Sequence, residues 1–197
     1  MKIKKIKVAI LISGRGTNML SLIKASKNQE YPAEIAVVIS NKQDAHGLEV
    51  AKQNNIKTAF VNHKDYGTRE EFDRQLTKII EEHNCKIVCL AGFMRLLSEQ
   101  FVKKWHDHLI NVHPSILPAF KGRNAIHDAL EYGVKITGCT VHYVSKEMDS
   151  GPIIKQAPVE VLESDNKETL ASRILQKEHI IYKEALEIVC KNIAEKK

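Results

Sequence analysis

The chain has 197 residues, of which 43% are hydrophobic and 27% charged, and its formal net charge is +6 at pH 7. This composition is typical of a globular protein and excludes a disordered or collagen-like chain. No window approaches the roughly 18 uninterrupted apolar residues of a membrane span, so we expect no membrane partner. The length suits one large domain, which we predict over residues 1–197.

The basic excess comes mostly from lysines spread along the whole chain, and aromatic residues make up only 6%. Nucleic-acid-binding proteins usually concentrate arginines and stacking rings. We therefore interpret the charge either as a solvated surface or as an attraction for a small anionic substrate, and we expect no nucleic-acid partner.

The four cysteines, at positions 85, 89, 139 and 190, form no C-x-x-C pair, which argues against a zinc ribbon or a thioredoxin-like redox site. Cys85 and Cys89 flank an apolar stretch, where a small buried side chain fits. The basic and apolar start of the chain lacks the cleavage site of a signal peptide. Reduced thiols and this start indicate a cytoplasmic protein.

Apolar runs typical of strands alternate with segments at helical spacing. Strands are predicted over Ile6–Ile12, Glu34–Ser40, Thr58–Val61, Ile87–Ala91 and Leu109–Val112. Helices are predicted over Met19–Ala25, Gly47–Asn54, Arg69–His83 and Ser98–Trp105. This alternation predicts an α/β fold, with a Rossmann-like, mostly parallel twisted sheet and helices on both faces.

The pattern changes after residue 133. Ile136–Val144 and Ile153–Val161 are predicted as antiparallel strands of a hairpin at the sheet edge, and Asn166–Ile193 as one long amphipathic helix. In such folds ligands bind outside the carboxyl ends of the strands. The site is therefore expected among Ser13–Asn18, Gly92–Leu97 and Asn111–Pro118.

Ser13–Asn18 forms a glycine-rich turn between the first strand and the first helix. Glycines let the backbone approach a ligand, and a helix N-terminus offers free N–H groups to an anion. The turn lacks the third glycine of a dinucleotide fingerprint and the Gly-Lys-Ser/Thr of a Walker A loop. It is either a cradle for a single phosphate or a plain strand-to-helix turn.

Asn111 and His113 flank Val112 at a predicted strand end, so both side chains project from the same face. An amide and an imidazole side by side suit the stabilisation of an oxyanion, although a buried histidine with an ordinary partner explains the pattern equally. Asp149 lies in a turn between the two late strands. A carboxylate beside His113 would hold the imidazole and favour its charged form, but nothing in the sequence places Asp149 there, and a turn cap is the simpler interpretation.

Metal and thiol chemistry find little support in the sequence. His106 and His108 are the only close histidine pair, without carboxylates at ligand spacing, so we expect no metal. No cysteine lies on a polar turn beside a basic residue, as a nucleophilic thiol would. The basic segment Lys121–Asn124 is either a mobile surface loop or a lid.

Four segments together resemble one family. ISGRGTN at residues 12–18, AGFMRLL at 91–97, INVHPSILPAFKG at 110–122 and GCTVHYVSKEMDSGPII at 138–154 occur in one order. The chain resembles the phosphoribosylglycinamide formyltransferases, also called glycinamide ribonucleotide transformylases, of the folate-dependent formyltransferase family, over essentially its whole length. The resemblance implies the formyltransferase fold and de novo purine biosynthesis. It also implies 10-formyltetrahydrofolate as co-substrate, a phosphorylated ribonucleotide acceptor, no metal, and a monomer or weak homodimer.

The resemblance also implies site residues. The catalytic trio would be Asn111, His113 and Asp149. The ribonucleotide would contact Gly16, Thr17, Asn18 and Glu178, and the folate would contact Arg69, Met94, Arg95, Leu96, Leu97 and Asn111. His142 falls where the family has a histidine near the site, whereas Ile126 stands where a polar histidine is expected. We expect the trio to converge on a pocket that has the glycine turn at its rim.

Three alternatives remain to be distinguished. A methionyl-tRNA formyltransferase or a formyl-folate hydrolase would share the chemistry, but each carries a further domain for which 197 residues leave no room. A nicotinamide oxidoreductase is disfavoured, because no acidic residue ends the second strand. A nucleic-acid-binding module would show salt-dependent binding of DNA or RNA.

Overall fold

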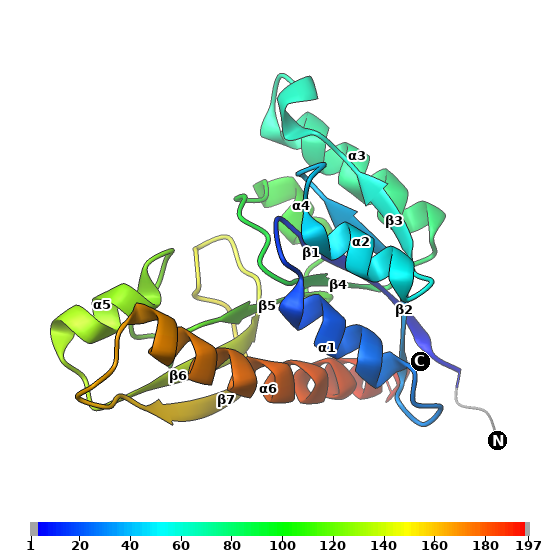
Figure 1. Ribbon diagram of the computed structural model, residues 1–197. Helices are drawn as coiled ribbons and strands as arrows, with labels where there is room; N and C mark the ends of the chain where they lie inside the picture. The colour runs from blue at the N-terminus through cyan, green and yellow to red at the C-terminus, as the bar shows by residue number, and fades with distance from the viewer. Residues whose placement is uncertain (1–3, 196–197) are drawn as a thin grey trace.

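The computed structural model describes residues 4–195 and contains one seven-stranded sheet (Figure 1). The strand order is β3-β2-β1-β4-β5-β6-β7. The first five strands are parallel: β1 (Ile6–Ile12), β2 (Ala33–Ser40), β3 (Lys57–Phe60), β4 (Ile87–Leu90) and β5 (Leu109–His113). The last two are antiparallel: β6 (Ile136–Tyr143) and β7 (Ile153–Glu160). The predicted α/β sheet with a late antiparallel hairpin is confirmed; the ends of the predicted domain, 1–3 and 196–197, lie outside the described residues.

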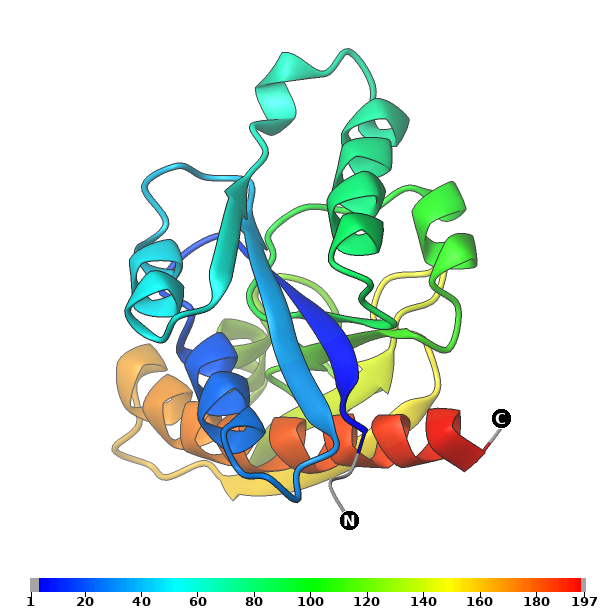
Figure 2. The same ribbon diagram turned by 90° about the vertical axis from the view of Figure 1, so that its right-hand side faces the viewer.

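Helices cover both faces of the sheet, because buried side chains alternate along the strands. Val8, Ile10 and Ile12 pack under α1 (Thr17–Ser26), α2 (His46–Gln53) and α6 (Lys167–Glu195). Ala9 and Leu11 point the other way, toward α3 (Arg69–Glu82) and α4 (Glu99–Lys104). Figure 2 shows α1 and α2 on one side of the strands and α3 and α4 on the other.

The carboxyl ends of β1, β4 and β5 lie side by side at one edge of the sheet. Leu11 pairs with Leu90, and Leu90 pairs with Asn111. The order reverses at β1, since β2 lies on one side of it and β4 on the other. Ligands of such sheets bind at this reversal, so the fold brings the three predicted ligand segments to one place.

Two short helices escape sequence prediction: α5 (Ala125–Tyr132) and the 3-10 helix His63–Asp65. Helix α5 has only eight residues and follows a basic loop; its apolar residues follow helical spacing, but they are few and include two alanines. Ile126 in α5 packs against the large core cluster, which accounts for an apolar residue at this position. Among the helices of residues 4–195, including the 29-residue α6, none is long and apolar enough to cross a membrane.

Candidate active site

A cavity of about 590 Å³ opens at the carboxyl edge of the sheet. Its walls come from the loop 92–97 after β4, the end of β5 and the loop 144–149 between β6 and β7. Gly122 and Arg123 close one side of it. The cavity lies at the carboxyl ends of β4 and β5, next to the reversal of strand order at β1, and two of the three predicted ligand segments line it.

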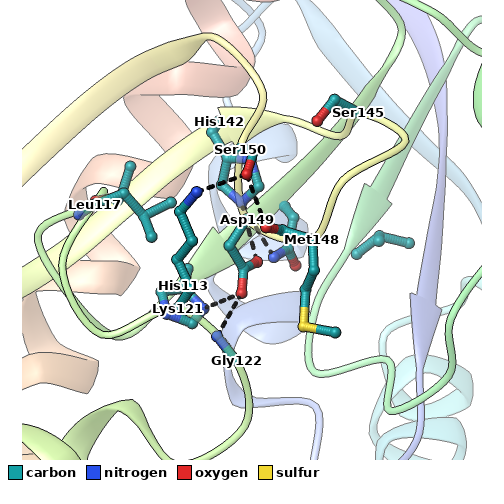
Figure 3. Close-up of polar contacts among 12 residues, drawn as sticks. His113, Leu117, Lys121, Gly122, His142, Ser145, Met148, Asp149 and Ser150 are labelled. Atoms are coloured by element: carbon teal, nitrogen blue, oxygen red, sulfur yellow. Dashed lines mark hydrogen bonds and ion pairs between the residues drawn. The ribbon is translucent and has the colours of Figure 1, made fainter.

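The predicted trio lies together in the wall of this cavity. Asn111 and His113 leave β5 on the same face, and the β6–β7 loop returns Asp149 to them. Nδ1 of His113 lies 3.4 Å from Oδ2 of Asp149, and the side chains are 6% and 10% exposed. The proximity of Asp149 to His113, which no sequence pattern indicated, is thus a property of the fold (Figure 3).

The turn that carries Asp149 is tightly fixed. Asp149 has a left-handed backbone with φ of 50°, a conformation that aspartate tolerates better than most residues. A side chain at Gly151 would overlap the backbone carbonyl of Tyr143, so only glycine fits where the turn enters β7.

Both ring nitrogens of His113 face acceptors. Nε2 lies 2.8 Å from the carbonyl oxygen of Phe120, and Nδ1 faces the carboxylate of Asp149. A carbonyl and an ionised carboxylate offer no proton, so a doubly protonated ring satisfies both partners. The ring is therefore held between a backbone carbonyl on one side and the carboxylate of the β6–β7 loop on the other.

His142 is the neutral histidine of the site. Burial lowers its pKa, and this effect outweighs the nearby Asp149 carboxylate, which lies 3.7 Å away and favours the charged ring. Its Nδ1 is 2.8 Å from the carbonyl oxygen of Tyr143, so the proton belongs on that nitrogen. Nε2 then accepts from the amide of Asn111 at 3.4 Å, a contact that orients the amide.

Three consecutive residues of the loop before α5 contact the trio and its turn, and two of them, Lys121 and Gly122, are labelled in Figure 3. Phe120 bonds to the ring of His113, as described above, and the backbone N–H of Gly122 donates to Oδ2 of Asp149 at 2.8 Å. The ammonium of Lys121 donates to Oγ of Ser150 at 2.6 Å. Hydrogen bonds therefore hold the loop over the site. This agrees better with the interpretation of the loop as a lid than with its interpretation as a mobile surface loop.

The predicted folate residues all line the cavity, in the order Arg69, Met94, Arg95, Leu96, Leu97 and Asn111. Met94 and Leu96 are 62% and 48% exposed, so the cavity mouth has an apolar rim. The guanidinium of Arg95 lies 5.5 Å from the centre of the Phe72 ring, close enough for a cation–π contact. These residues offer an aromatic ligand an apolar surface and the two guanidinium groups of Arg69 and Arg95.

The predicted ribonucleotide residues lie outside the lining of this cavity, contrary to the expectation that the glycine turn forms its rim; they are Gly16, Thr17, Asn18 and Glu178. The turn lies next to the cavity instead, because the backbone N–H of Met94, a lining residue, donates to Oγ of Ser13 at 2.9 Å. Asn18 and Glu178 contact each other, with Nδ2 donating to Oε2 at 2.7 Å, and both are buried. Burial raises the pKa of Glu178.

Gly47 is a structural partner of the glycine turn that the sequence did not single out. Its backbone N–H donates to the carbonyl oxygen of Gly14 at 3.0 Å. A Cβ at this position would lie 2.5 Å from Cδ1 of Ile12 and 3.2 Å from Cα of Gly16. The N-terminus of α2 therefore packs directly on the turn, and the only sequence signal was a glycine at the start of a helix.

All four cysteines are buried free thiols. Burial raises the pKa of Cys85, Cys139 and Cys190 to about 12, so these thiols are poor nucleophiles at neutral pH. Within residues 4–195, no group of three or more His, Cys, Asp or Glu side chains has the arrangement of a metal site.

Comparisons with known proteins agree with one another. Residues 6–186 match the family model described as formyl transferase. The trifunctional purine biosynthetic protein adenosine-3 of Gallus gallus is 49% identical over 185 residues, which are 94% of this chain but only 18% of that protein. Phosphoribosylglycinamide formyltransferase of Escherichia coli (strain K12) is 40% identical over 175 residues, 89% of this chain and 82% of that protein.

A solved structure extends the similarity to three dimensions. The crystal structure of glycinamide ribonucleotide transformylase 1 from Symbiobacterium toebii matches with a TM-score of 0.94 and 41% identity. The match covers 96% of this chain and 89% of the other. The predicted fold is confirmed by this similarity.

Proposed function

Because this chain belongs to the formyl transferase family, we propose that it transfers the formyl group of 10-formyltetrahydrofolate to the primary amine of N1-(5-phospho-D-ribosyl)glycinamide. The products are the N-formyl compound and tetrahydrofolate. This reaction belongs to de novo purine biosynthesis, and the trifunctional relatives are named for purine biosynthesis.

The observation that carries the proposal is the convergence of Asn111, His113 and Asp149 on one cavity wall. When the amine attacks the formyl carbon, negative charge develops on the formyl oxygen. Hydrogen-bond donors held in place before the reaction stabilise that charge best. We assign this role to the amide of Asn111 and the imidazolium of His113.

We assign to Asp149 the transfer of the proton that the attacking amine loses. The attacking amine loses a proton as the new C–N bond forms, and the folate nitrogen gains one as the old C–N bond breaks. The Asp149 carboxylate lies 3.4 Å from His113, and we assign to it the transfer of this proton. The amine is nucleophilic enough once it is bound and aligned, so the mechanism needs no covalent enzyme intermediate.

His113 must exchange a partner before it donates to substrate. Its two nitrogens are directed at Phe120 and Asp149, and the Phe120 carbonyl belongs to the fastened loop. The contact with Asp149, at 3.4 Å, is longer than the contact with Phe120, at 2.8 Å. We therefore assign the approach of the formyl oxygen to the Nδ1 side, while the Phe120 carbonyl keeps the ring in place.

The donor occupies the cavity. The apolar rim of Met94 and Leu96 suits the rings of the folate, and Arg69 and Arg95 suit its anionic glutamate tail. The acceptor phosphate is assigned to Gly16, Thr17 and Asn18, where the N-terminus of α1 presents free N–H groups. Glu178 lies beside Asn18 and completes the ribonucleotide side of the site.

A spectrophotometric assay with 10-formyltetrahydrofolate tests the proposal. We expect deformylation that depends on added glycinamide ribonucleotide. Equal rates of deformylation with and without this acceptor would instead indicate a formyl-folate hydrolase. No deformylation under either condition would reject formyl transfer.

Both substrates are small molecules, and we propose no metal and no nucleic-acid partner for this chain. A monomer or weak homodimer remains the predicted oligomeric state. The four free cysteines support a reducing, cytoplasmic location.

A further inference from the structure

His113, Thr140 and Gln156 form one row across three adjacent strands. His113 of β5 is paired with Thr140 of β6, and Thr140 is paired with Gln156 of the edge strand β7. Residues paired directly across antiparallel strands project from the same face. The row therefore connects the edge strand β7 to the imidazole of the trio.

Thr140 is fully buried, and its hydroxyl uses its whole hydrogen-bonding capacity. Oγ1 donates to the carbonyl oxygen of Ser115 at 2.7 Å and accepts from the backbone N–H of Leu117 at 3.0 Å. Its remaining lone pair accepts from Nε2 of Gln156 at 3.0 Å. One hydroxyl thus fixes two points of the loop that follows His113.

Gln156 fixes the same loop a second time. Its Nε2 also donates to the carbonyl oxygen of Leu117 at 2.9 Å. Both polar groups of the Leu117 backbone are therefore held by the row, the N–H by Thr140 and the carbonyl by Gln156. An amide with two N–H groups is required, because both of its partners accept here.

The last residue of the loop 115–120 contacts the ring of His113. The hydroxyl of Ser115 donates to the carbonyl oxygen of Ala119 at 2.6 Å, which closes the loop on itself. The next carbonyl, that of Phe120, lies 2.8 Å from Nε2 of His113. A shift of Leu117 is thereby transmitted to the acceptor that orients the imidazole.

We propose that Gln156 is a positioning residue for His113, acting through Thr140 and the loop 115–120. This inference rests on the proposed role of His113 in formyl transfer, but the geometry of the ring can be measured without any substrate. Gln156 itself does not line the cavity of the trio, and it acts by holding the loop.

The test uses Gln156→Ala and Gln156→Glu, with Lys155→Ala as matched control. Glutamate keeps the shape of the side chain, but its ionised carboxylate cannot donate to the Leu117 carbonyl. Lys155 is the neighbouring residue on β7, and its ammonium pairs with Glu184 of α6 at 2.7 Å, away from the row. A general weakening of β7 would affect all three variants.

The first readout is the Nε2–H signal of His113 in protein labelled with 15N-histidine, assigned by its loss in His113→Asn. We expect this proton to exchange with solvent at least about 10-fold faster in both Gln156 variants than in the wild type and Lys155→Ala, because its hydrogen bond to Phe120 is loosened. An unchanged signal in folded Gln156→Ala and Gln156→Glu would overturn the proposal.

The second readout is the formyl-transfer assay. Misplacement of a reacting group lowers the rate of the chemical step more than substrate binding, so kcat should fall about 10- to 100-fold with both KM values nearly unchanged. A rise in KM with unaltered kcat would contradict the positioning role. If the wild type itself does not transfer formyl groups, the proposed function fails, while the exchange measurement still decides the role of Gln156.

Discussion

Nδ1 of His113 lies 3.4 Å from Oδ2 of Asp149, although one residue ends the last parallel strand and the other follows the first antiparallel strand. The β6–β7 loop passes over the carboxyl end of β5 and brings the carboxylate to the imidazole. The hairpin at the sheet edge is thus part of the site, because it supplies the carboxylate that faces His113.

Asp149→Asn tests the charge of this pair. Asparagine keeps an oxygen for the Gly122 N–H, so the turn should stay folded, while the negative charge is lost. We expect kcat to fall by about 10²- to 10⁴-fold, the usual contribution of a general acid–base group. Kinetic assays with circular dichroism measure both effects.

The control for this variant is Ser150→Ala, which removes the contact with Lys121 but none of the trio. It should retain near-wild-type kcat. Near-wild-type turnover by folded Asp149→Asn would show that the carboxylate is not needed.

Gly47→Ala tests the assignment of the glycine turn. The new methyl group would collide with Ile12 and press on the turn at Gly14 and Gly16. We expect a higher KM for the ribonucleotide and an unchanged KM for the folate. Steady-state kinetics with each substrate varied in turn measure the two constants.

Gly67→Ala is the matched control, because a Cβ there makes an ordinary contact, 3.4 Å from the Glu71 carboxylate. It should leave both KM values unchanged. If Gly47→Ala changes only the folate KM, the phosphate does not bind at this turn.

Glu178→Gln separates stability from binding. Burial raises the pKa of Glu178, so ionisation costs more in the folded than in the unfolded chain. An amide avoids that cost, and we expect the free energy of unfolding at pH 7.5 to rise by about 1 kcal/mol. The KM for the ribonucleotide should rise as well, since the carboxylate is assigned to its binding.

The pH dependence fixes the sign of this effect. As the pH falls through the raised pKa toward 4.5, the folded carboxyl binds a proton before the unfolded one, and the wild type gains stability. The difference between the two proteins should therefore shrink in urea titrations at pH 5. A variant less stable than the wild type at both pH values would contradict this account.

His142 should remain neutral below the pH at which ordinary histidines become charged. Burial lowers its pKa from 6.5, so the folded chain binds this proton less readily than the unfolded chain. The contribution of His142 to stability is present above pH 6.5 and is lost as the pH falls through that value. Glu178 acts in the opposite direction over the acidic range, so the His142 effect is best isolated spectroscopically.

A histidine titration followed by NMR, with His142→Gln to assign the signal, measures this directly. The ring signal of His142 should stay at its neutral position as free histidine titrates. A midpoint at or above 6.5 would show that Asp149, and not burial, dominates the environment of His142.

Much of the fold is predictable because buried parallel strands carry strong apolar patterns. The predicted first strand coincides with β1 (Ile6–Ile12), and the predicted helix over Ser98–Trp105 contains α4, which Ser98 caps by accepting from the N–H of Phe101. Helix α5 escaped prediction although its apolar residues follow helical spacing: Ala125 and Ala129 are buried, and Ile126 and Leu130 are partly buried against the core. Two of these four side chains are single methyl groups, so the apolar signal in the sequence is small.

The site is less predictable, because several of its contacts are made by the backbone. The partners of His113 and Asp149 in the loop before α5 are the carbonyl of Phe120, a group that every residue carries, and the N–H of Gly122, which only proline lacks. Residue identities cannot indicate them. The position of the glycine turn beside the cavity, and not at its rim, likewise follows from how β1 and β4 are joined through Ser13 and Met94.

The most direct test of the account follows the formyl carbon itself. Wild-type protein is incubated with 10-formyltetrahydrofolate labelled with 13C in the formyl group and with glycinamide ribonucleotide, and the products are identified by NMR. We predict one labelled N-formyl product for each tetrahydrofolate formed. Label recovered as free formate, at a rate that does not depend on the concentration of glycinamide ribonucleotide, would contradict formyl transfer by this chain.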